Sequence, residues 1–245
     1  MHEIMAGHSK WANIKRRKWA QDAKKAAVFT KMARNITVAA REGGGDPDKN
    51  FRLALAIDQA KKVNMPKENI EKARKKGTGE LKGERIEECL YEGIGPAQVQ
   101  FIVKSYTDNR NRSAAEIKHL FHKHGGDFAS VKWNFSEKGV IRVSKEEVED
   151  KQLDSEDWEL GLIDRGAEDI KMEEEGMTIH CAMGDLSSIK ELLEENGVNI
   201  ETADIEYIPH TAQKVEGEDR EKVERFMEAL EDCEEVNDYY NNCEF

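Results

Sequence analysis

The residues best suited to binding chemistry lie in one stretch of the chain, from His8 to Arg41. This stretch holds ten lysines or arginines and a single acid, Asp22. Two tryptophans, Trp11 and Trp19, are interleaved with the cations of its first half. Because cations bind phosphates and flat aromatic rings stack on bases, this composition predicts a segment that binds a polyanion. Its ten cations are Lys10, Lys15, Arg16, Arg17, Lys18, Lys24, Lys25, Lys31, Arg34 and Arg41.

A helix of 3.6 residues per turn gives this stretch two faces, one apolar and one basic. The alternative is an ordinary amphipathic helix, whose solvated face is rich in cations and whose tryptophans belong to the core. That alternative suits any single lysine, but a solvated face normally mixes charges of both signs, so the whole cluster favours binding. The apolar sector holds Phe29, Met32, Ala33, Ile36 and Ala40, and the basic sector holds Arg17, Lys24, Lys31, Arg34 and Arg41.

A second candidate site is the segment 109–113, Asn-Arg-Asn-Arg-Ser. It stands at the expected start of a helix, where free backbone amides favour anions, and Arg110 and Arg112 can each make bidentate phosphate contacts. The alternative is a simple N-cap whose arginines pair with neighbouring acids. The sequence leaves these two interpretations equally open.

Other reactive side chains give no catalytic pattern. His119, His122 and His124 lie close together, but no Cys, Asp or Glu completes a metal-ligand set at helical spacing. His180 and Cys181 are neighbours in an expected strand, so their side chains point to opposite faces. No nucleophile elbow, P-loop or dinucleotide motif is present. We therefore expect no enzyme activity, no metal and no cofactor.

Charge is divided unevenly along the 245 residues, whose formal net charge is −12. Residues 1–80 hold 19 cations and 9 acids, a balance of +10, and residues 81–245 hold 19 cations and 41 acids, a balance of −22. A basic domain on an acidic body orients toward a polyanion with one end only. Without an apolar run long enough to cross a bilayer and with four scattered cysteines, we expect a cytoplasmic protein with reduced thiols.

The elements that position the basic residues are expected to be helices through residue 80. The first is expected to end near Glu42, before three glycines, and Asp46-Pro47 resembles an N-cap followed by proline at the first helical position. The next helices are expected at about 47–63 and 66–76. Residues 1–80 are thus predicted to form a basic helical domain.

Beyond residue 80 the periodicity predicts strands and helices in alternation. Strands are expected at 84–92 and 98–106, a helix from 108 to 124, and an extended segment at 128–135. Residues 136–208 follow the order β-α-β-β-α-β, which is the ferredoxin-like order. The last helix and strand, within 209–245, are too small to fold alone and are expected to complete residues 81–135. The fold class is therefore α+β, with a helical bundle followed by two α/β (ferredoxin-like) domains, the third inserted in the second.

Five stretches of the sequence together resemble the YebC family of bacterial regulatory proteins, whose mitochondrial relatives are translational activators. The resemblance implies three domains, with the third inserted in the second, and no enzymatic activity. It places the basic opening of the family on His8, Lys10, Trp11 and 15–18. The stretches are AGHSKWANIKRRK, AAREGGGDPDKNFRLALAIDQAKKVNMPKENIEKA, YEGIGP, TDNRNRSAAEIKHLFHKHGG and ALEDCEEVNDYYNN.

Three kinds of partner stay open at this point, and the oligomeric state does too. The resemblance implies either a DNA-binding transcriptional regulator or a ribosome-associated factor that helps translation through difficult sequences such as proline runs. The sequence shows no evident recognition helix for reading duplex DNA. Binding to structured ribosomal RNA needs only phosphate and stacking contacts. A protein scaffold that docks a partner through the inserted domain would bind without regard to salt.

We predict that nucleic-acid affinity resides in residues 8–41 and falls steeply with salt. Changing Lys15, Arg16, Arg17 and Lys18 to Glu should reduce the slope of log affinity against log salt by roughly 3 to 4, since each phosphate contact contributes about 0.9. Filter binding at several salt concentrations measures this slope. A variant that bound as tightly as the wild type would contradict the assignment.

Overall fold

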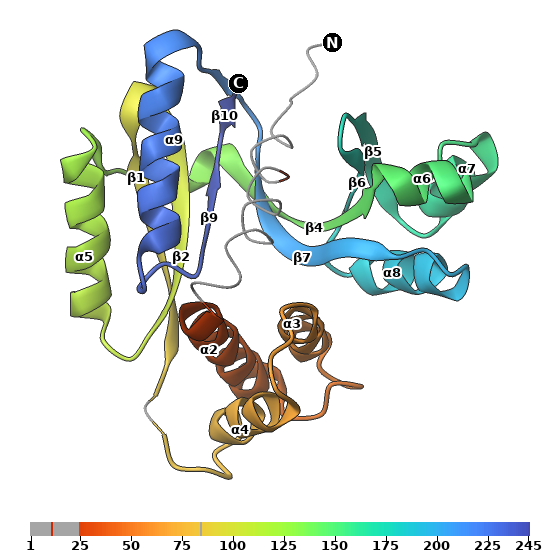
Figure 1. Ribbon diagram of the computed structural model, residues 1–245, viewed down its shortest axis with the longest axis horizontal. Helices are drawn as coiled ribbons and strands as arrows, with labels where there is room; N and C mark the ends of the chain where they lie inside the picture. The colour runs from red at the N-terminus through yellow and green to blue at the C-terminus, as the bar shows by residue number, and fades with distance from the viewer. Residues whose placement is uncertain (1–10, 12–24, 84) are drawn as a thin grey trace.

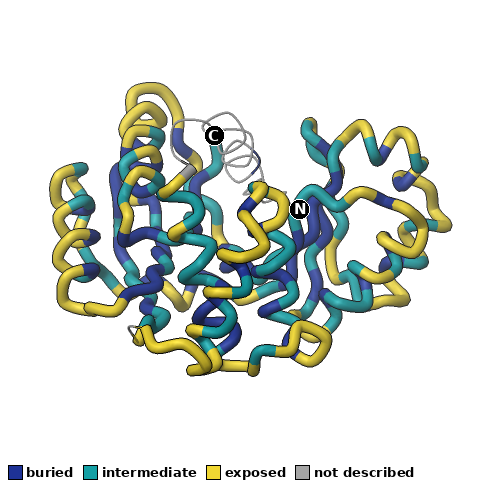
Figure 2. Tube along the Cα trace, turned by 60° about the horizontal axis from the view of Figure 1, so that its bottom comes forward, coloured by how far each residue is buried: buried dark blue, intermediate teal, exposed yellow. Residues whose placement is uncertain are grey.

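The computed structural model describes Trp11, residues 25–83 and residues 85–245. Three bodies are visible, a group of helices and two sheets with their covering helices (Figure 1). Buried residues follow the strands of both sheets, and exposed residues follow the outer faces of the helices (Figure 2). Among the described helices, none is long and apolar enough to span a membrane. The α+β class with three domains, expected from the sequence, is confirmed.

The helical domain consists of α2 (Lys25–Gly43), α3 (Phe51–Lys62) and α4 (Lys67–Gly77). The apolar face predicted for the first of these helices is the face that packs, since Ile36 and Ala40 are 0% and 1% exposed. They meet Leu53 and Ala60 of α3 and Ile70 of α4, together with other small and branched side chains. Alanines at these contacts let the three helices approach closely.

The start of α3 differs from the prediction. Asp46 accepts backbone bonds in a turn, and the N-cap is Asn50, whose Oδ1 accepts the amide of Leu53 at 3.1 Å. Nδ2 of Asn50 also donates to the carbonyls of Ala39 (2.8 Å) and Gly44 (2.7 Å), so one buried amide joins α3 to the end of α2. The tight fit requires Gly43, because a Cβ there would lie 2.6 Å from Asn50 Cγ. Asn50 is therefore the N-cap rather than Asp46, because Asn50 caps α3 and also donates to α2, whereas Asp46 bonds only within its own turn.

The middle domain is a four-stranded sheet of order β3-β1-β2-β9, covered on one side by α5 and α9. The C-terminal segment completes this sheet, as predicted, because β9 pairs antiparallel with β2. Phe101, Phe121 and Phe226 form the aromatic centre of its core, with ring centroids 4.9 to 6.2 Å apart. The elements are β1 (Glu87–Ile94), η1 (Pro96–Gln98), β2 (Gln100–Thr107), α5 (Arg110–Lys123), β3 (Asp127–Phe128), β8 (Gln213–Lys214), α9 (Gly217–Asp232), β9 (Asp238–Asn241) and β10 (Cys243–Glu244), the last pairing with β8.

The inserted domain has the ferredoxin-like sheet order β5-β6-β4-β7 expected from its sequence. One short helix, α6, was not predicted, and Ser144 caps it by accepting the amide of Glu147 at 3.4 Å. Burial in this core raises the pKa of the Cys181 thiol to about 11. The elements are β4 (Phe135–Ser144), α6 (Lys145–Lys151), α7 (Glu156–Asp164), β5 (Ala167–Glu173), β6 (Gly176–Cys181), α8 (Leu186–Glu195) and β7 (Ile200–Pro209).

The sheet face opposite α6–α8 in the inserted domain is polar and yet largely buried. Arg142 and Glu206 are 2% and 3% exposed and form a bidentate ion pair, with N–O distances of 2.6 and 3.0 Å. The pKa of Arg142 is raised by Glu206 although burial acts in the other direction. Thr178, which lies beside Arg142 on β6, is 1% exposed. This face therefore packs against protein.

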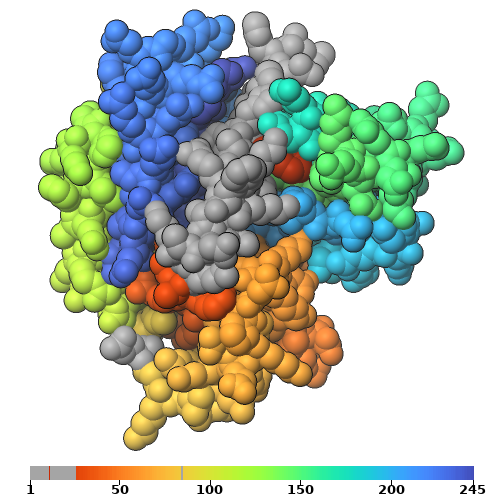
Figure 3. All heavy atoms as spheres, in the orientation of Figure 1, coloured from red at the N-terminus to blue at the C-terminus, as the bar shows by residue number. Residues whose placement is uncertain are grey.

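Apolar and ionic contacts hold the three domains together (Figure 3). Leu55 of α3 is 4% exposed and joins the core of the inserted domain, where Lys190 also pairs with Asp58 at 2.8 Å. The two sheets meet where Tyr207 of β7 packs against Tyr240 of β9, with ring centroids 5.4 Å apart. The helical domain thus rests on both sheet domains.

The Asn50 cap yields a stability prediction. Asn50→Ala should lower the free energy of unfolding by about 1 to 3 kcal/mol, because it removes the cap and leaves the carbonyls of Ala39 and Gly44 without their donor. Asn50→Asp keeps the cap acceptor and should cost less at the cap but still lose both donors. Asp46→Ala is the control and should change stability little. Urea denaturation followed by circular dichroism measures all three, and a larger loss for Asp46→Ala would contradict the assignment.

Candidate nucleic-acid interface

Most of the predicted binding residues lie outside the part of the chain that the structure describes. Of Lys25, only the backbone at the start of α2 is described. The described candidates are Trp11, Lys31, Arg34, Arg110 and Arg112. The candidates outside the described residues are His8, Lys10, Lys15, Arg16, Arg17, Lys18 and Lys24.

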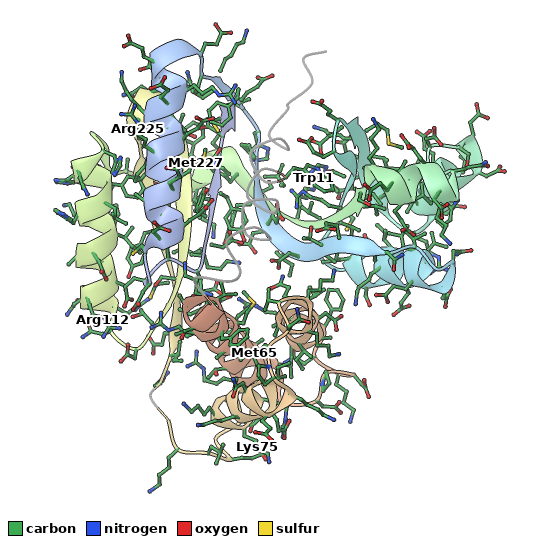
Figure 4. The ribbon with its side chains drawn as sticks, in the orientation of Figure 1. Trp11, Met65, Lys75, Arg112, Arg225 and Met227 are labelled. Carbon is green, nitrogen blue, oxygen red and sulfur yellow. The ribbon has the colours of Figure 1, made fainter. Side chains whose placement is uncertain are left out.

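Trp11 is buried against the inserted domain rather than presented to solvent (Figure 4). Its side chain is 3% exposed. The indole Nε1 donates to Glu173 Oε2 at 2.7 Å and to Thr178 Oγ1 at 3.3 Å, and Thr178 itself donates to Glu173 at 2.6 Å. In this conformation the ring covers the polar sheet face, so for Trp11 the structure matches the alternative of a core residue.

Lys31 and Arg34 of α2 contact the middle domain. Lys31 Nζ donates to the carbonyl of Glu231, and Arg34 Nη1 donates to the carbonyl of Glu234, both at 2.9 Å. Asn237 returns a bond to the carbonyl of Lys31 at 3.2 Å. The acceptors lie at the C-terminal end of α9, where the helix dipole favours cations. These two cations therefore hold α2 against α9.

Arg110 and Arg112 at the start of α5 have acidic partners. Asn109 caps the helix by accepting the amide of Arg112 at 3.1 Å. Arg112 donates to Asp108 at 2.7 Å and to Glu235 at 2.9 Å, and these bonds raise the pKa of its guanidinium. Arg110 is more open, with a side chain 70% exposed and 3.9 Å from Glu87. The structure thus joins Arg112 to acids and leaves Arg110 facing solvent.

Exposed cations lie along α4 and on the chain that follows it. Lys75 is half-exposed and pairs with Glu71 at 3.5 Å, and it is labelled in Figure 4. Four other lysines here are exposed and make no ion pair with a described residue. The run Arg74-Lys75-Lys76 forms the last turn of α4, where cations also suit the helix dipole. The four are Lys67, Lys72, Lys76 and Lys82.

The histidines near the end of α5 have protein partners. His122 Nε2 lies 2.9 Å from Asp127 Oδ1, and the ring of His124 lies 5.4 Å from the ring of Phe226. Desolvation lowers the pKa of His124. Within the described residues, no group of three or more His, Cys, Asp or Glu is arranged to hold a metal ion.

Comparison with known proteins places this architecture in a family. The family model described as "TACO1/YebC protein N-terminal domain" matches residues 9–80, and the one described as "TACO1/YebC second and third domain" matches residues 86–243. Two of the relatives compared below are named probable transcriptional regulatory proteins. The chain belongs to the TACO1/YebC family.

Individual relatives cover nearly the whole chain. A protein of Thermotoga maritima named "Probable transcriptional regulatory protein" is 50% identical over 243 residues, which is 98% of this chain and 94% of the relative. A protein of the same name from Desulfitobacterium hafniense is 45% identical, covering 98% of this chain and 96% of the relative. The crystal structure of a conserved hypothetical protein from Aquifex aeolicus has a TM-score of 0.81 at 43% identity, covering 91% of this chain and 92% of that one.

The Trp11 contact yields a stability prediction. Trp11→Phe should lower the free energy of unfolding by about 1 to 3 kcal/mol, because it removes a hydrogen bond to a carboxylate. Trp11→Ala should cost about 3 to 5 kcal/mol, because it also empties the space that the ring fills. Trp133→Phe, at an exposed position, is the matched control and should have little effect. If Trp11→Ala denatured at the same urea concentration as the wild type, the contact would not contribute to stability.

Proposed function

We propose that this protein is a non-enzymatic regulator of gene expression that binds nucleic acid through its basic helical domain, residues 1–80, in the cytoplasm. The observation that carries the proposal is the separation of charge, +10 in residues 1–80 against −22 in residues 81–245. A polyanion is attracted to one end of such a molecule and repelled by the other. The names of the relatives, which describe regulators of transcription, support the same class.

The described surface supports this proposal at the far end of the helical domain. The exposed lysines there extend the basic character of residues 8–41 onto α4 and the chain after it. They are free of ion pairs with described residues, so a phosphate would not have to displace an acid. Lysine binds phosphate as a point charge without reading the base sequence.

The first form of the proposal is a transcriptional regulator that binds duplex DNA. The printed names of the relatives favour it. Sequence-selective reading of the major groove requires Asn, Gln or Arg on an exposed recognition helix. Asn69 of α4 is exposed among the lysines of the helical domain and fits this requirement.

The second form is a ribosome-associated translation factor that contacts ribosomal RNA and relieves stalling, for example at proline runs. The described surface of the helical domain favours it, because Lys31 and Arg34 of α2 contact α9, and α4 exposes mainly lysines. Such a surface suits the phosphates of a folded RNA better than the base edges of a duplex.

Sedimentation of cell lysate through a density gradient distinguishes the two forms. We expect the full-length protein to travel with ribosomes after DNase treatment at near-physiological salt, and a variant with Lys67, Lys72 and Lys76 changed to Glu to shift toward the top, because three favourable phosphate contacts become repulsive. The matched control changes Arg220, Lys222 and Arg225 of α9 to Glu. These three cations are exposed on the acidic middle domain, each pairing with an acid on the same helix, and their reversal should leave sedimentation unchanged (Arg225 in Figure 4).

Two other outcomes would redirect the proposal. A protein that stays at the top of the gradient but retards duplex DNA in a sequence-dependent way is a transcriptional regulator. Ribosome association that is insensitive to salt and to both charge reversals would mean docking onto a protein, and it would contradict nucleic-acid binding.

A further inference from the structure

Trp133 is the most exposed large apolar side chain in the described part of the chain, at 71%. It lies on a single 3-10 turn, η2 (Lys132–Asn134), between β3 of the middle domain and β4 of the inserted domain. An indole ring in water loses the gain of burial, about 25 cal/mol for each Å² of apolar surface. A ligand that covers this ring would recover part of that gain.

The turn that carries Trp133 is held on its C-terminal side by Asn134, which is 2% exposed. Asn134 Nδ2 donates to Gln100 Oε1 at 2.8 Å and to the carbonyl of Thr211 at 3.1 Å, and Oδ1 accepts the amide of Thr211 at 3.0 Å. The carbonyl of Asn134 accepts the amide of His210 at 2.7 Å. These bonds tie together the two segments by which the chain enters and leaves the inserted domain.

The turn is also held on its N-terminal side. Glu92 Oε2 of β1 accepts the amides of Val131 at 2.8 Å and Lys132 at 2.7 Å. Val131 is 1% exposed and packs in the apolar contact between the two sheets. Because both sides of the turn are fixed, the ring is already positioned before a ligand binds. Stacking of a ligand on the ring therefore costs little conformational entropy of the protein.

The orientation of the indole favours stacking on a flat ligand. Its Nε1 donates to the carbonyl of Ser130 at 3.1 Å, so the polar edge of the ring is already satisfied within the turn. A flat, apolar surface can then cover the ring without leaving a buried donor unpaired.

Polar and cationic side chains lie on the segments next to Trp133. The side chain of Lys132 is 48% exposed, with its ammonium 5.3 Å from the ring centroid of Tyr207 and 3.6 Å from Glu137. His210 is exposed and lies 3.0 Å from Ser136 through Nε2. An aromatic anchor in a protein interface is normally ringed by other apolar contacts, whereas a base-stacking ring has cations beside it for the phosphate.

The exposed aliphatic side chains of the described chain belong to other elements. Leu160 and Ile163 lie on α7, and Met172 lies on β5 at the edge of the inserted sheet. They are therefore on other elements than the turn that carries Trp133.

We propose that Trp133 is a stacking platform for an unpaired nucleobase, with the ammonium of Lys132 beside the adjoining phosphate. This inference rests on the proposed nucleic-acid binding and assigns it a second contact, in the joint between the two sheet domains and outside the helical domain. Binding of nucleic acid at the helical domain depends on its phosphates and therefore on salt. Binding at Trp133 depends on a base that is not paired within a duplex.

The test compares the affinity of full-length variants for a fluorescein-labelled oligoadenylate strand and for the same strand annealed to oligouridylate. Trp133→Ala should weaken binding of the single strand roughly 5- to 150-fold, as expected for one lost base–aromatic stack, and should leave duplex binding unchanged. Trp133→Phe should recover part of the loss. Because the ring is exposed, the thermal midpoint of Trp133→Ala should equal that of the wild type, which separates the effect from misfolding.

Leu160→Ala is the matched control, since Leu160 is 61% exposed on α7. It should bind both probes as the wild type does. Equal single-strand affinity of Trp133→Ala and wild type would overturn the stacking assignment while leaving the proposed function in place. A wild type that bound neither probe at low salt would overturn both, and a Trp133→Ala defect confined to binding of a protein would make this residue a protein contact instead.

Discussion

The positions of the candidate binding residues that the structure describes depend on apolar contacts that cross between the domains. Leu55 of α3 is part of the core of the inserted domain, and Tyr207 and Tyr240 join the two sheets. Rotation of one domain against another would expose this surface to water. Inter-domain contacts that are mainly polar permit motion, but contacts with a shared apolar core restrict it. The lysines of α4, the turn at Trp133 and the acidic helices of the inserted domain therefore keep fixed relative positions.

Electrostatic character follows from the same arrangement. The buried pair Arg142–Glu206 is satisfied by its own two-point geometry, so it adds no net charge to the surface. The cations of α2 that face α9 neutralise carbonyl dipoles rather than phosphates. On the described surface of the helical domain, the exposed lysines of α4 are free of such contacts. A basic stretch of sequence is therefore not always a basic surface, because the middle domain covers part of the cations of α2.

The sequence predicted the elements well where periodicity is local, and poorly where a partner is distant. Burial of Ile36 and Ala40 follows from the helix wheel alone. The contacts of Lys31 and Arg34 could not be predicted, because their acceptors lie 200 residues further along the chain. The cap of α3 fell on Asn50 instead of Asp46 for a similar reason, since its second role is to bond to α2. The three-domain arrangement with its insertion follows from the order of the predicted strands and helices, and the resemblance to a known family implies the same arrangement.

The tryptophans show this limit most clearly. Lys10-Trp11 and Lys132-Trp133 are the same dipeptide, yet the rings are 3% and 71% exposed. A basic residue beside a tryptophan predicts a stacking site at the first position, where the ring is in fact buried. Tertiary contacts decide the outcome, because Glu173 and Thr178 receive one indole whereas the other indole bonds within its own turn.

The pairing of β2 with β9 has a consequence for the order in which the protein is made. Residues 100–107 of β2 can pair with β9 only after residues 238–241 have been synthesised. The strands and helices of the inserted domain, residues 135–209, are synthesised between the two. Because domains fold as their residues leave the ribosome, the inserted domain is able to close before the domain that surrounds it. The carbonyls of Glu231 and Glu234 that receive α2 also come late. A nascent chain therefore carries its basic helix uncovered for most of its synthesis, and the covering contact is among the last to form.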